Sequence, residues 1–176
     1  YFLQDNSRYV QLGQFKMTER QKFASDSHRE YLQHDTQKWK RDYFNRDNGG
    51  YLVVDRERIA HSKTSKNEKA KFDKEYAMSM VFAKGGYKIE MLKEVSGISS
   101  YDVLINGVAA DLKRLSGHNN IVSYAKKATR KQGAKIVLFE FDTMTGKIRD
   151  ELNRLKRMGI KVKYFTADNK TTIIDL

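Results

Sequence analysis

The sequence predicts a mixed α/β fold, in which a mixed sheet is flanked by helices and follows a mainly helical N-terminal extension. Asn106-Gly107 stands between two short apolar runs and predicts a two-residue hairpin turn, because both residues tolerate the positive φ that this turn requires. The nearly continuous apolar run at 135–141 predicts a strand that is covered on both faces. A helical pattern at 147–158 and an alternating run at 160–165 complete a β-α-β unit with parallel strands.

Residues 1–60 are predicted to form the extension, with one short strand. Thr18 and Gln21 have the spacing of a capping box, in which each side chain bonds to the backbone at the start of a helix. The glycine-free stretch that follows predicts one or two helices up to about Asn45. A turn rich in glycine then introduces a short strand at 51–54.

The second predicted domain, residues 61–176, contains alternating helices and strands. A polar, basic loop is predicted at 55–66, and a Ser-x-x-Glu capping pattern at Ser65 opens a helix that ends at Gly85-Gly86. From residue 66 the predicted order is helix, strand, strand, strand, helix, strand, helix, strand, strand. After the first helix the expected ranges are 87–92, the hairpin 101–114, about 120–132, 135–141, 147–158, 160–165 and 171–175.

Composition narrows the functional classes. A formal charge of +12 favours a polyanionic partner, and nucleic acid is the commonest one. The absence of cysteine excludes a disulfide framework and metal sites made of thiolates. No apolar stretch has the length of a membrane span and no signal peptide is recognisable, so a soluble protein is expected. The chain begins with Tyr1 rather than methionine, which indicates a piece of a longer polypeptide.

The predicted hairpin places two acids opposite each other. Counting outward from its turn pairs Asp102 with Asp111, with both side chains on one face. Like charges directly opposite are destabilising, and a divalent cation held between them would remove that cost. Period-two alternation puts Lys113 on the face of Asp111, where an ammonium can stabilise negative charge on a phosphate or orient a metal-bound water. The plain alternative is an exposed hairpin with two solvated carboxylates and a neighbouring lysine.

A third carboxylate stands on the first helix of this domain. Its aromatic or small residues share one face: Phe72, Ser79 and Phe82. Glu75 lies on the same face, where a carboxylate is costly unless it is paired or binds a metal. Pairing with a neighbouring lysine is the alternative interpretation.

The helix at about 120–132 is predicted to be amphipathic. Its inner stripe consists of Ile121, Ala125, Ala128 and Gln132. Its basic surface consists of Lys126, Lys127, Arg130 and Lys131. The basic surface suits contacts with nucleic-acid phosphates, although a solvated helix face would look the same. Gln132, a polar residue on a buried stripe, is a candidate for orienting a phosphate or the attacking water.

The pattern Asp102-x8-Asp111-x-Lys113 resembles the active site of the PD-(D/E)XK nuclease superfamily. Tyr101 stands where that family has proline, a position that is not a ligand. The first six elements from residue 66 reproduce the αβββαβ order of its core. The resemblance therefore implies a PD-(D/E)XK-like fold and hydrolysis of phosphodiester bonds.

The resemblance also implies a metal site. Glu75 matches the helix glutamate that often joins this site, with Glu68 as its competitor. With Asp102, Asp111 and the main-chain carbonyl of Leu112, it would bind Mg²⁺ or Mn²⁺, because ligand sets made only of oxygen suit these ions better than Zn²⁺.

Within that superfamily, residues 66–165 look like the CdiA-type C-terminal tRNase domain. The motifs are Glu75, Gly86-Tyr87, Tyr101 to Gly107, Asp111-Leu112-Lys113 and Ala128-x3-Gln132. Such domains are the toxic tips of contact-dependent inhibition proteins and other polymorphic toxins, and similar tips occur on phage head-morphogenesis proteins. The resemblance implies cleavage of tRNA or another nucleic acid in a cell's cytoplasm, delivery at the end of a larger secreted or phage-associated protein, and an acidic immunity protein as partner.

Three alternatives stay open at this point. One is a DNA endonuclease of the same fold, because the phosphodiester chemistry is shared. Another is a metal-independent ribonuclease that uses His61 or His118. The third is a nucleic-acid-binding module without catalytic activity.

Overall fold

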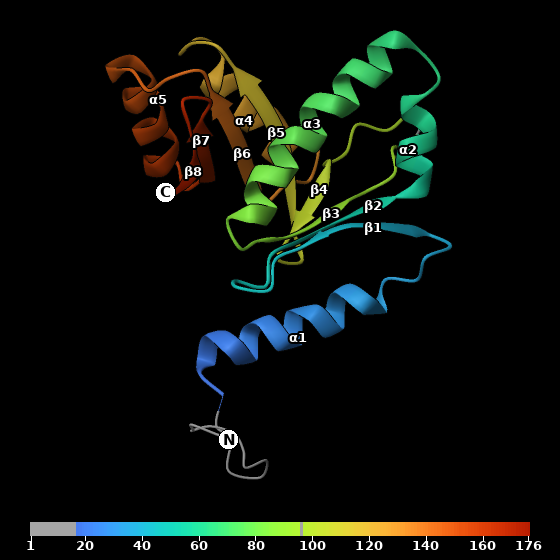
Figure 1. The fold of residues 1–176 in the computed structure, drawn as a ribbon. Coiled ribbons are helices and arrows are strands. Elements are labelled where there is room, and N and C mark those ends of the chain that lie inside the picture. Colours follow the sequence, from blue (N-terminus) through green and yellow to red (C-terminus); the bar gives the residue numbers. More distant parts are fainter. Residues whose placement is uncertain (1–16, 96) are drawn as a thin grey trace.

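Eight strands form a single mixed sheet in the part of the chain that the structure describes, residues 17–95 and 97–176 of a computed structural model (Figure 1). The elements are α1 (Glu19–Gln33), β1 (Trp39–Phe44), β2 (Tyr51–Asp55), α2 (Arg56–Ser62), α3 (Lys66–Lys84), β3 (Lys88–Met91), β4 (Val103–Ile105), β5 (Val108–Leu115), α4 (Ile121–Arg130), β6 (Ile136–Phe141), α5 (Gly146–Arg157), β7 (Lys161–Thr166) and β8 (Asn169–Asp175). The strands lie in sequence order across the sheet. The pairs β2–β3, β5–β6 and β6–β7 are parallel and the remaining pairs are antiparallel. The predicted mixed α/β fold is confirmed.

Helices cover both faces of the sheet, as the alternation of β2 shows. Leu52 and Val54 point into the core beneath α3. Tyr51 and Val53 point to the other face, where they pack against Tyr31 of α1. Figure 1 shows α1 and α3 on opposite sides of the sheet. The core between the sheet and α3 therefore extends to the N-terminal hairpin.

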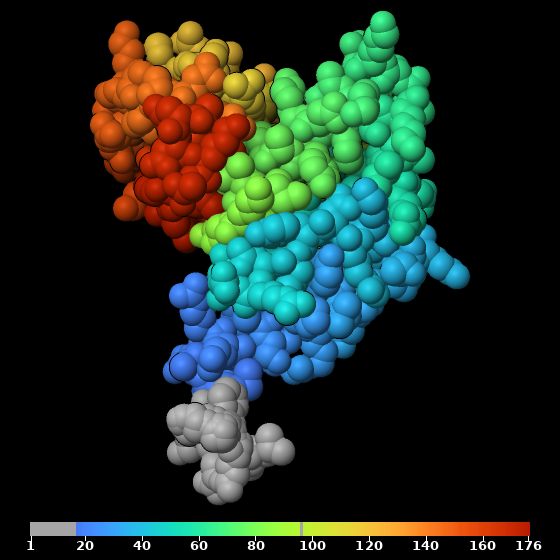
Figure 2. Space-filling view, viewed as in Figure 1, coloured from blue at the N-terminus to red at the C-terminus, as the bar shows by residue number. Residues whose placement is uncertain are grey.

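At the other end of the sheet, α4 and α5 pack on the face opposite α3. Leu138 of β6 points into the α3 core, whereas its neighbours Val137 and Phe139 pack with the buried residues of α4 and α5. In the space-filling view the surface is notched between α3, in green, and the gold and orange segment that holds α4 and β6 (Figure 2). None of the helices in the described residues is both long enough and apolar enough to cross a membrane.

From residue 66 the observed order of elements is the predicted one, α3-β3-β4-β5-α4-β6-α5-β7-β8. Ser65 caps α3 by accepting a hydrogen bond from the N–H of Glu68 (3.1 Å). The end of α3 packs backbone to backbone on the start of β2, because a Cβ atom on Gly50 would lie 1.9 Å from the carbonyl oxygen of Ala83. This close approach fixes α3, and with it Glu75, over the sheet.

In the N-terminal part, the short strand predicted at 51–54 is confirmed as β2, but the helical prediction up to about Asn45 is wrong over its last residues. The capping box at Thr18 and Gln21 is present, but α1 ends at Gln33, and residues 39–44 form β1, which pairs with β2. The chain turns because the side chain of Asp35 accepts hydrogen bonds from the N–H groups of the next residues, including Lys38 (3.0 Å). The helical prediction failed because the pairing of β1 with β2 is a contact that no local pattern in β1 reveals. The predictions for residues 1–16 lie outside the described part of the chain.

The predicted loop at 55–66 is also wrong for most of its length. Residues 56–62 form α2, which Asp55 caps by accepting a hydrogen bond from the N–H of Glu57 (2.9 Å). The expected boundary between residues 60 and 61 falls inside this helix, and the sheet continues from β2 to β3. The importance of α2 is that it places Arg58 beside the acids predicted for the site.

Candidate active site

The hairpin turn has the geometry predicted for it. Asn106 and Gly107 both have positive φ, 49° and 79°. The paired residues are Ile105 with Val108, Leu104 with Ala109 and Val103 with Ala110. The register predicted from the turn is confirmed over these pairs. The β4 strand begins at Val103, so Asp102 lies just before it, and its N–H donates to the carbonyl of Ala110 (3.1 Å).

The structure brings the two predicted acids of the hairpin together. The carboxyl groups of Asp102 and Asp111 lie close enough for a hydrogen bond between them. Burial raises the pKa of both groups, and for Asp102 this bond and the charge of Asp111 raise the pKa further. For Asp111 the charge of Glu75 also raises the pKa, and the charges of Lys113 and Lys71 oppose this rise. The neighbouring cations therefore do not offset the effect of burying two acids side by side.

The backbone of Leu112 adds a further oxygen beside this pair. Its N–H would bond to the neighbouring strand if β4 were longer, but instead it donates to Oδ2 of Asp102 (3.0 Å). The N–H and the carbonyl of one strand residue point to the same side. The Leu112 carbonyl therefore lies on the edge of β5 that faces Asp102.

Glu75 reaches the same region from α3, but its partner is an arginine. The Glu75 carboxylate pairs with the guanidinium of Arg58, whose side chain is only 2% exposed. Arg58 also donates to the carbonyls of Leu92 (2.6 Å) and Asp102 (3.3 Å). Burial and then the charge of Asp102 raise the pKa of Glu75 to about 7, against the opposing charges of Arg58 and Lys71. The sequence left pairing with a lysine open for Glu75, but its partner in the structure is the buried Arg58.

Lys113 lies beside Asp111, as alternation along β5 predicted. Its positive charge lowers the pKa of Asp111. Its Nζ lies 4.0 Å from the centre of the Tyr124 ring on α4, a cation–π contact. The ring of Tyr124 therefore helps to orient the ammonium group of Lys113. No pattern in the sequence had indicated a role for this tyrosine.

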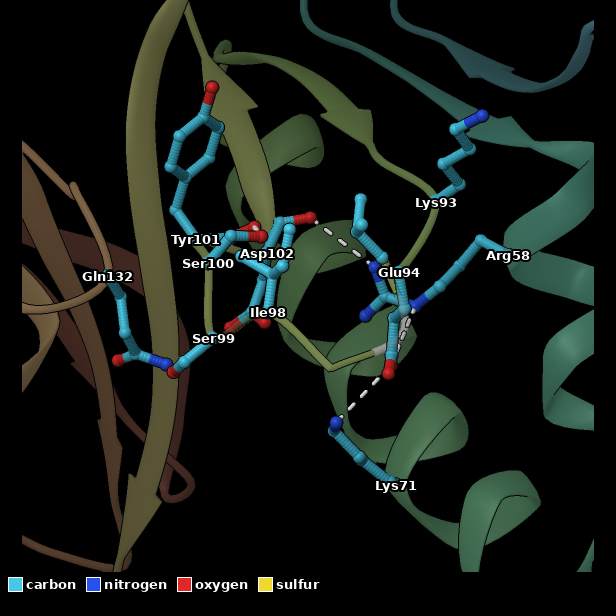
Figure 3. Close-up of a pocket in the computed structure, with 11 residues that line it drawn as sticks. Arg58, Lys71, Lys93, Glu94, Ile98, Ser99, Ser100, Tyr101, Asp102 and Gln132 are labelled. Atoms are coloured by element: carbon cyan, nitrogen blue, oxygen red, sulfur yellow. Dashed lines mark hydrogen bonds and ion pairs between the residues drawn. The ribbon is translucent and has the colours of Figure 1, made fainter.

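A polar cavity of about 140 Å³ adjoins Asp102. Its lining includes Arg58, Lys71, Lys93, Glu94, Tyr101 and Gln132. Gln132 lies beyond the last helical residue of α4, and Figure 3 shows its amide reaching toward Ser99 on the loop before β4. The predicted stripe of α4 is buried at its first three positions, whereas Gln132 is only half-buried and lines this cavity.

The predicted basic surface of α4 is open to solvent for the most part. Three of its residues are exposed: Lys127, Arg130 and Lys131. The fourth, Lys126, is half-buried. The helix also places Tyr124 at Lys113, so its basic surface and the acid pair belong to the same region of the molecule.

The charged residues of this region that the sequence did not indicate include Arg58, Lys71 and Glu94. Arg58 contacts residues 17, 34 and 44 positions away, and no local pattern could have indicated these contacts. Lys71 was detectable, because it precedes Glu75 by four residues and therefore shares its helix face.

A separate group of possible metal ligands lies at the edge of this region. Among the described residues, the group whose ligand atoms all lie within 4.8 Å of one another is His61, Glu68 and Glu94. His61 pairs with Glu68, and its Nε2 lies 3.6 Å from Glu94. Glu68 is therefore a partner of His61 in this structure. Among the described residues, the carboxylate oxygens of Glu75, Asp102 and Asp111 do not all lie within 4.8 Å of one another.

The raised pKa of Glu75 predicts how stability depends on pH. Between its ordinary pKa of 4.5 and the raised pKa of about 7, the folded protein binds more protons at this group than the unfolded protein does. Its contribution to the free energy of unfolding therefore falls as the pH rises through this window, by about 1.4 kcal/mol for each unit of pKa shift. Urea unfolding of metal-free protein measures this contribution as the difference between the wild type and Glu75→Gln. A difference that is constant with pH, or that favours the wild type at higher pH, would contradict this assignment.

The molecule thus combines a mixed α/β sheet with two coupled aspartates, a lysine and a polar cavity at the end of a short strand. A family model described as the contact-dependent growth inhibition CdiA C-terminal domain matches residues 100–174, which include Asp102, Asp111 and Lys113. The fold is similar to that of a chain in the solved CdiA-CT/CdiI toxin and immunity complex from Burkholderia pseudomallei. The TM-score is 0.50 at 18% sequence identity, over 65% of this chain and 89% of that one. No curated protein matches the sequence.

Proposed function

We propose that this chain is a metal-dependent nuclease of the PD-(D/E)XK type, and that it acts as a toxin domain that cleaves tRNA or other RNA. One observation carries the proposal, namely that the hairpin brings Asp102 and Asp111 into contact beside Lys113. A structural hairpin gains nothing from two buried acids that must share a proton. The resemblance of the site and the family match to residues 100–174 support the same class of activity.

The groups at the site suit a hard divalent cation. The neighbouring carboxyls of Asp102 and Asp111 need a further positive charge to ionise together, and the Leu112 carbonyl lies on the edge of β5 that faces Asp102. Oxygen ligands of this kind favour Mg²⁺ or Mn²⁺. A bound ion would polarise the scissile phosphate and lower the pKa of a water molecule. Glu75 is the third candidate ligand, although Arg58 holds its carboxylate in this structure.

The side chains around the acids have complementary roles in this proposal. Lys113, oriented by Tyr124, would stabilise negative charge on the phosphate as the bond breaks. Gln132, at the cavity, would orient a phosphate oxygen or the attacking water. The basic residues of α4 (Lys126, Lys127, Arg130 and Lys131) would contact neighbouring phosphates and make binding sensitive to salt.

The same comparisons support a proposal for the biological setting. The matched family is described as a C-terminal domain of proteins for contact-dependent growth inhibition. We therefore propose that this chain is the toxic end of a larger secreted protein and acts in the cytoplasm of a target cell. The related solved structure is a toxin bound to its immunity protein. A charge of +12 on this chain would favour an acidic immunity protein.

Incubating the protein with total RNA and with plasmid DNA, with Mg²⁺, Mn²⁺ or EDTA, tests the proposed function. The expected result is cleavage of RNA, with tRNA among the substrates, that requires the metal and stops in EDTA. Cleavage of plasmid alone would assign a DNA endonuclease. Cleavage that survives EDTA and is lost in His61→Ala or His118→Ala would replace the proposal with metal-independent catalysis. Salt-sensitive binding without cleavage would indicate a binding module.

A further inference from the structure

The side chain of Lys71 is placed at the active-site cavity by α3. It precedes Glu75 by four residues, so both side chains lie on the same face of the helix. Its Nζ lies 3.2 Å from Oε2 of Glu94, and both residues line the cavity with Asp102. Figure 3 shows Lys71 extending from α3 toward Glu94 on the loop before β4. A cation thus stands at the wall of the cavity formed by α3.

The electrostatic surroundings keep this lysine charged. Burial lowers the pKa of Lys71, but the charges of Glu75, Glu94 and Asp102 raise it and prevail. In turn, Lys71 lowers the pKa of Glu75 and of Asp111. Its ammonium is therefore close enough to act on the acidic residues of the site.

The pair of Lys71 with Glu94 contributes little to stability, because the lysine side chain is 48% exposed and solvent weakens such a pair. Glu94 also pairs with the guanidinium of Arg58 (3.7 Å), and one of its carboxylate oxygens lies 3.6 Å from Nε2 of His61. An acidic side chain that Lys71 and Arg58 share occupies the position that a phosphate of a substrate could take. Glu94 lies on a loop between β3 and β4, so it can move aside without disturbing a strand.

We propose that Lys71 binds a phosphate of the substrate next to the scissile one, and that this phosphate replaces Glu94 as its partner. The proposal rests on the nuclease function proposed above. Lys113 lies on the face of the hairpin that α4 covers, whereas Lys71 belongs to the helix on the opposite face of the sheet. The acid pair therefore has one lysine on each side, and a phosphodiester backbone that crosses it would meet both.

Substituting Lys71 by methionine tests this role, and the same helix offers a matched control. Lys69 is exposed and pairs with Asp73 (2.7 Å), away from the cavity, so Lys69→Met removes the same charge from the same helix. Both substitutions are made in an Asp111→Asn background, and the binding of fluorescein-labelled tRNA is measured by anisotropy. We expect Lys71→Met to weaken binding about tenfold and to reduce the salt slope by about one, and Lys69→Met to change the affinity less than about twofold. Melting temperatures should be the same for both variants.

Glu94→Gln provides a second measurement. Releasing Lys71 from its acidic partner should strengthen tRNA binding when Lys71 is present and have a much smaller effect in Lys71→Met. Equal affinities of the Lys71→Met and Lys69→Met proteins would overturn the role of Lys71. An equal gain from Glu94→Gln in both backgrounds would overturn the exchange with Glu94.

The failure of the nuclease proposal is distinguishable from these outcomes. A wild-type protein that cleaves neither RNA nor DNA with Mg²⁺ or Mn²⁺ would refute the nuclease function, while the binding comparison stays readable. In a wild-type protein that cleaves, Lys71→Met should lower kcat/KM about tenfold relative to Lys69→Met, and equal values would refute the inference alone.

Discussion

Replacing Asp111 by asparagine should abolish cleavage, with kcat at least about 100-fold lower, while the protein stays folded. Changing a residue that only supports a metal ligand lowers metal affinity or activity by about 10–100-fold. The loss of a charged ligand should therefore lower the activity by about 100-fold or more. The metal-free protein should become more stable, because burial raises the pKa of the Asp111 carboxyl and asparagine has no charge to bury. Cleavage assays with Mg²⁺ and urea unfolding without metal measure the two effects.

Asp175→Asn is the control for this substitution. Asp175 is a half-exposed residue of the edge strand β8 and pairs with Lys163 (2.8 Å), remote from the hairpin, so its substitution should leave cleavage intact. Asp102→Ala and Lys113→Ala should also abolish cleavage without unfolding the protein. Full activity of any of these active-site variants in the presence of EDTA would contradict metal-dependent catalysis at the hairpin.

Arg58→Met should destabilise the protein by about 3–5 kcal/mol, the usual cost of removing one partner of a buried ion pair. Arg58 is 2% exposed, and its loss would leave the Glu75 carboxylate buried without a partner. It would also leave the carbonyls of Leu92 and Asp102 without this donor. Urea unfolding at pH 8, above the pKa of about 7 for Glu75, measures the effect when that carboxylate is ionised.

The double variant Arg58→Met, Glu75→Gln separates the charge from the packing. Neutral glutamine needs no cation, so the double variant should recover part of the lost stability at pH 8. At pH 5.5 Glu75 holds its proton, and the cost of Arg58→Met alone should be smaller. A stability loss that is the same at both pH values, without recovery in the double variant, would show that Arg58 acts through packing alone.

Local turn chemistry explains why the hairpin was predictable. Asn106 and Gly107 determine the turn between β4 and β5, and the turn then determines which residues oppose each other. Capping residues and glycines likewise delimited the helices and strands after residue 66, because these signals act within a few residues. The contact of Asp102 with Asp111 could be predicted because it depends on this local register.

The environment of Glu75 could not be read from the sequence. Helical spacing indicated a buried carboxylate and left open whether a cation or a basic side chain balances it. Its partner, Arg58, lies on a helix where the sequence predicted a loop. The contacts of Arg58 depend on the packing of α2 against α3 and on its bond to the Asp102 carbonyl, just before β4. Similarly, β1 was missed because its six residues are stabilised by pairing with β2.

A crystal of the protein grown with Mn²⁺, measured for anomalous scattering, tests the metal site at the hairpin most directly. We predict an anomalous peak that lies within coordination distance of carboxylate oxygens from both Asp102 and Asp111, with the Leu112 carbonyl facing it. A map without a peak between these carboxyls would contradict the assignment. This holds whether the Mn²⁺ binds instead at His61, Glu68 and Glu94 or does not bind at all.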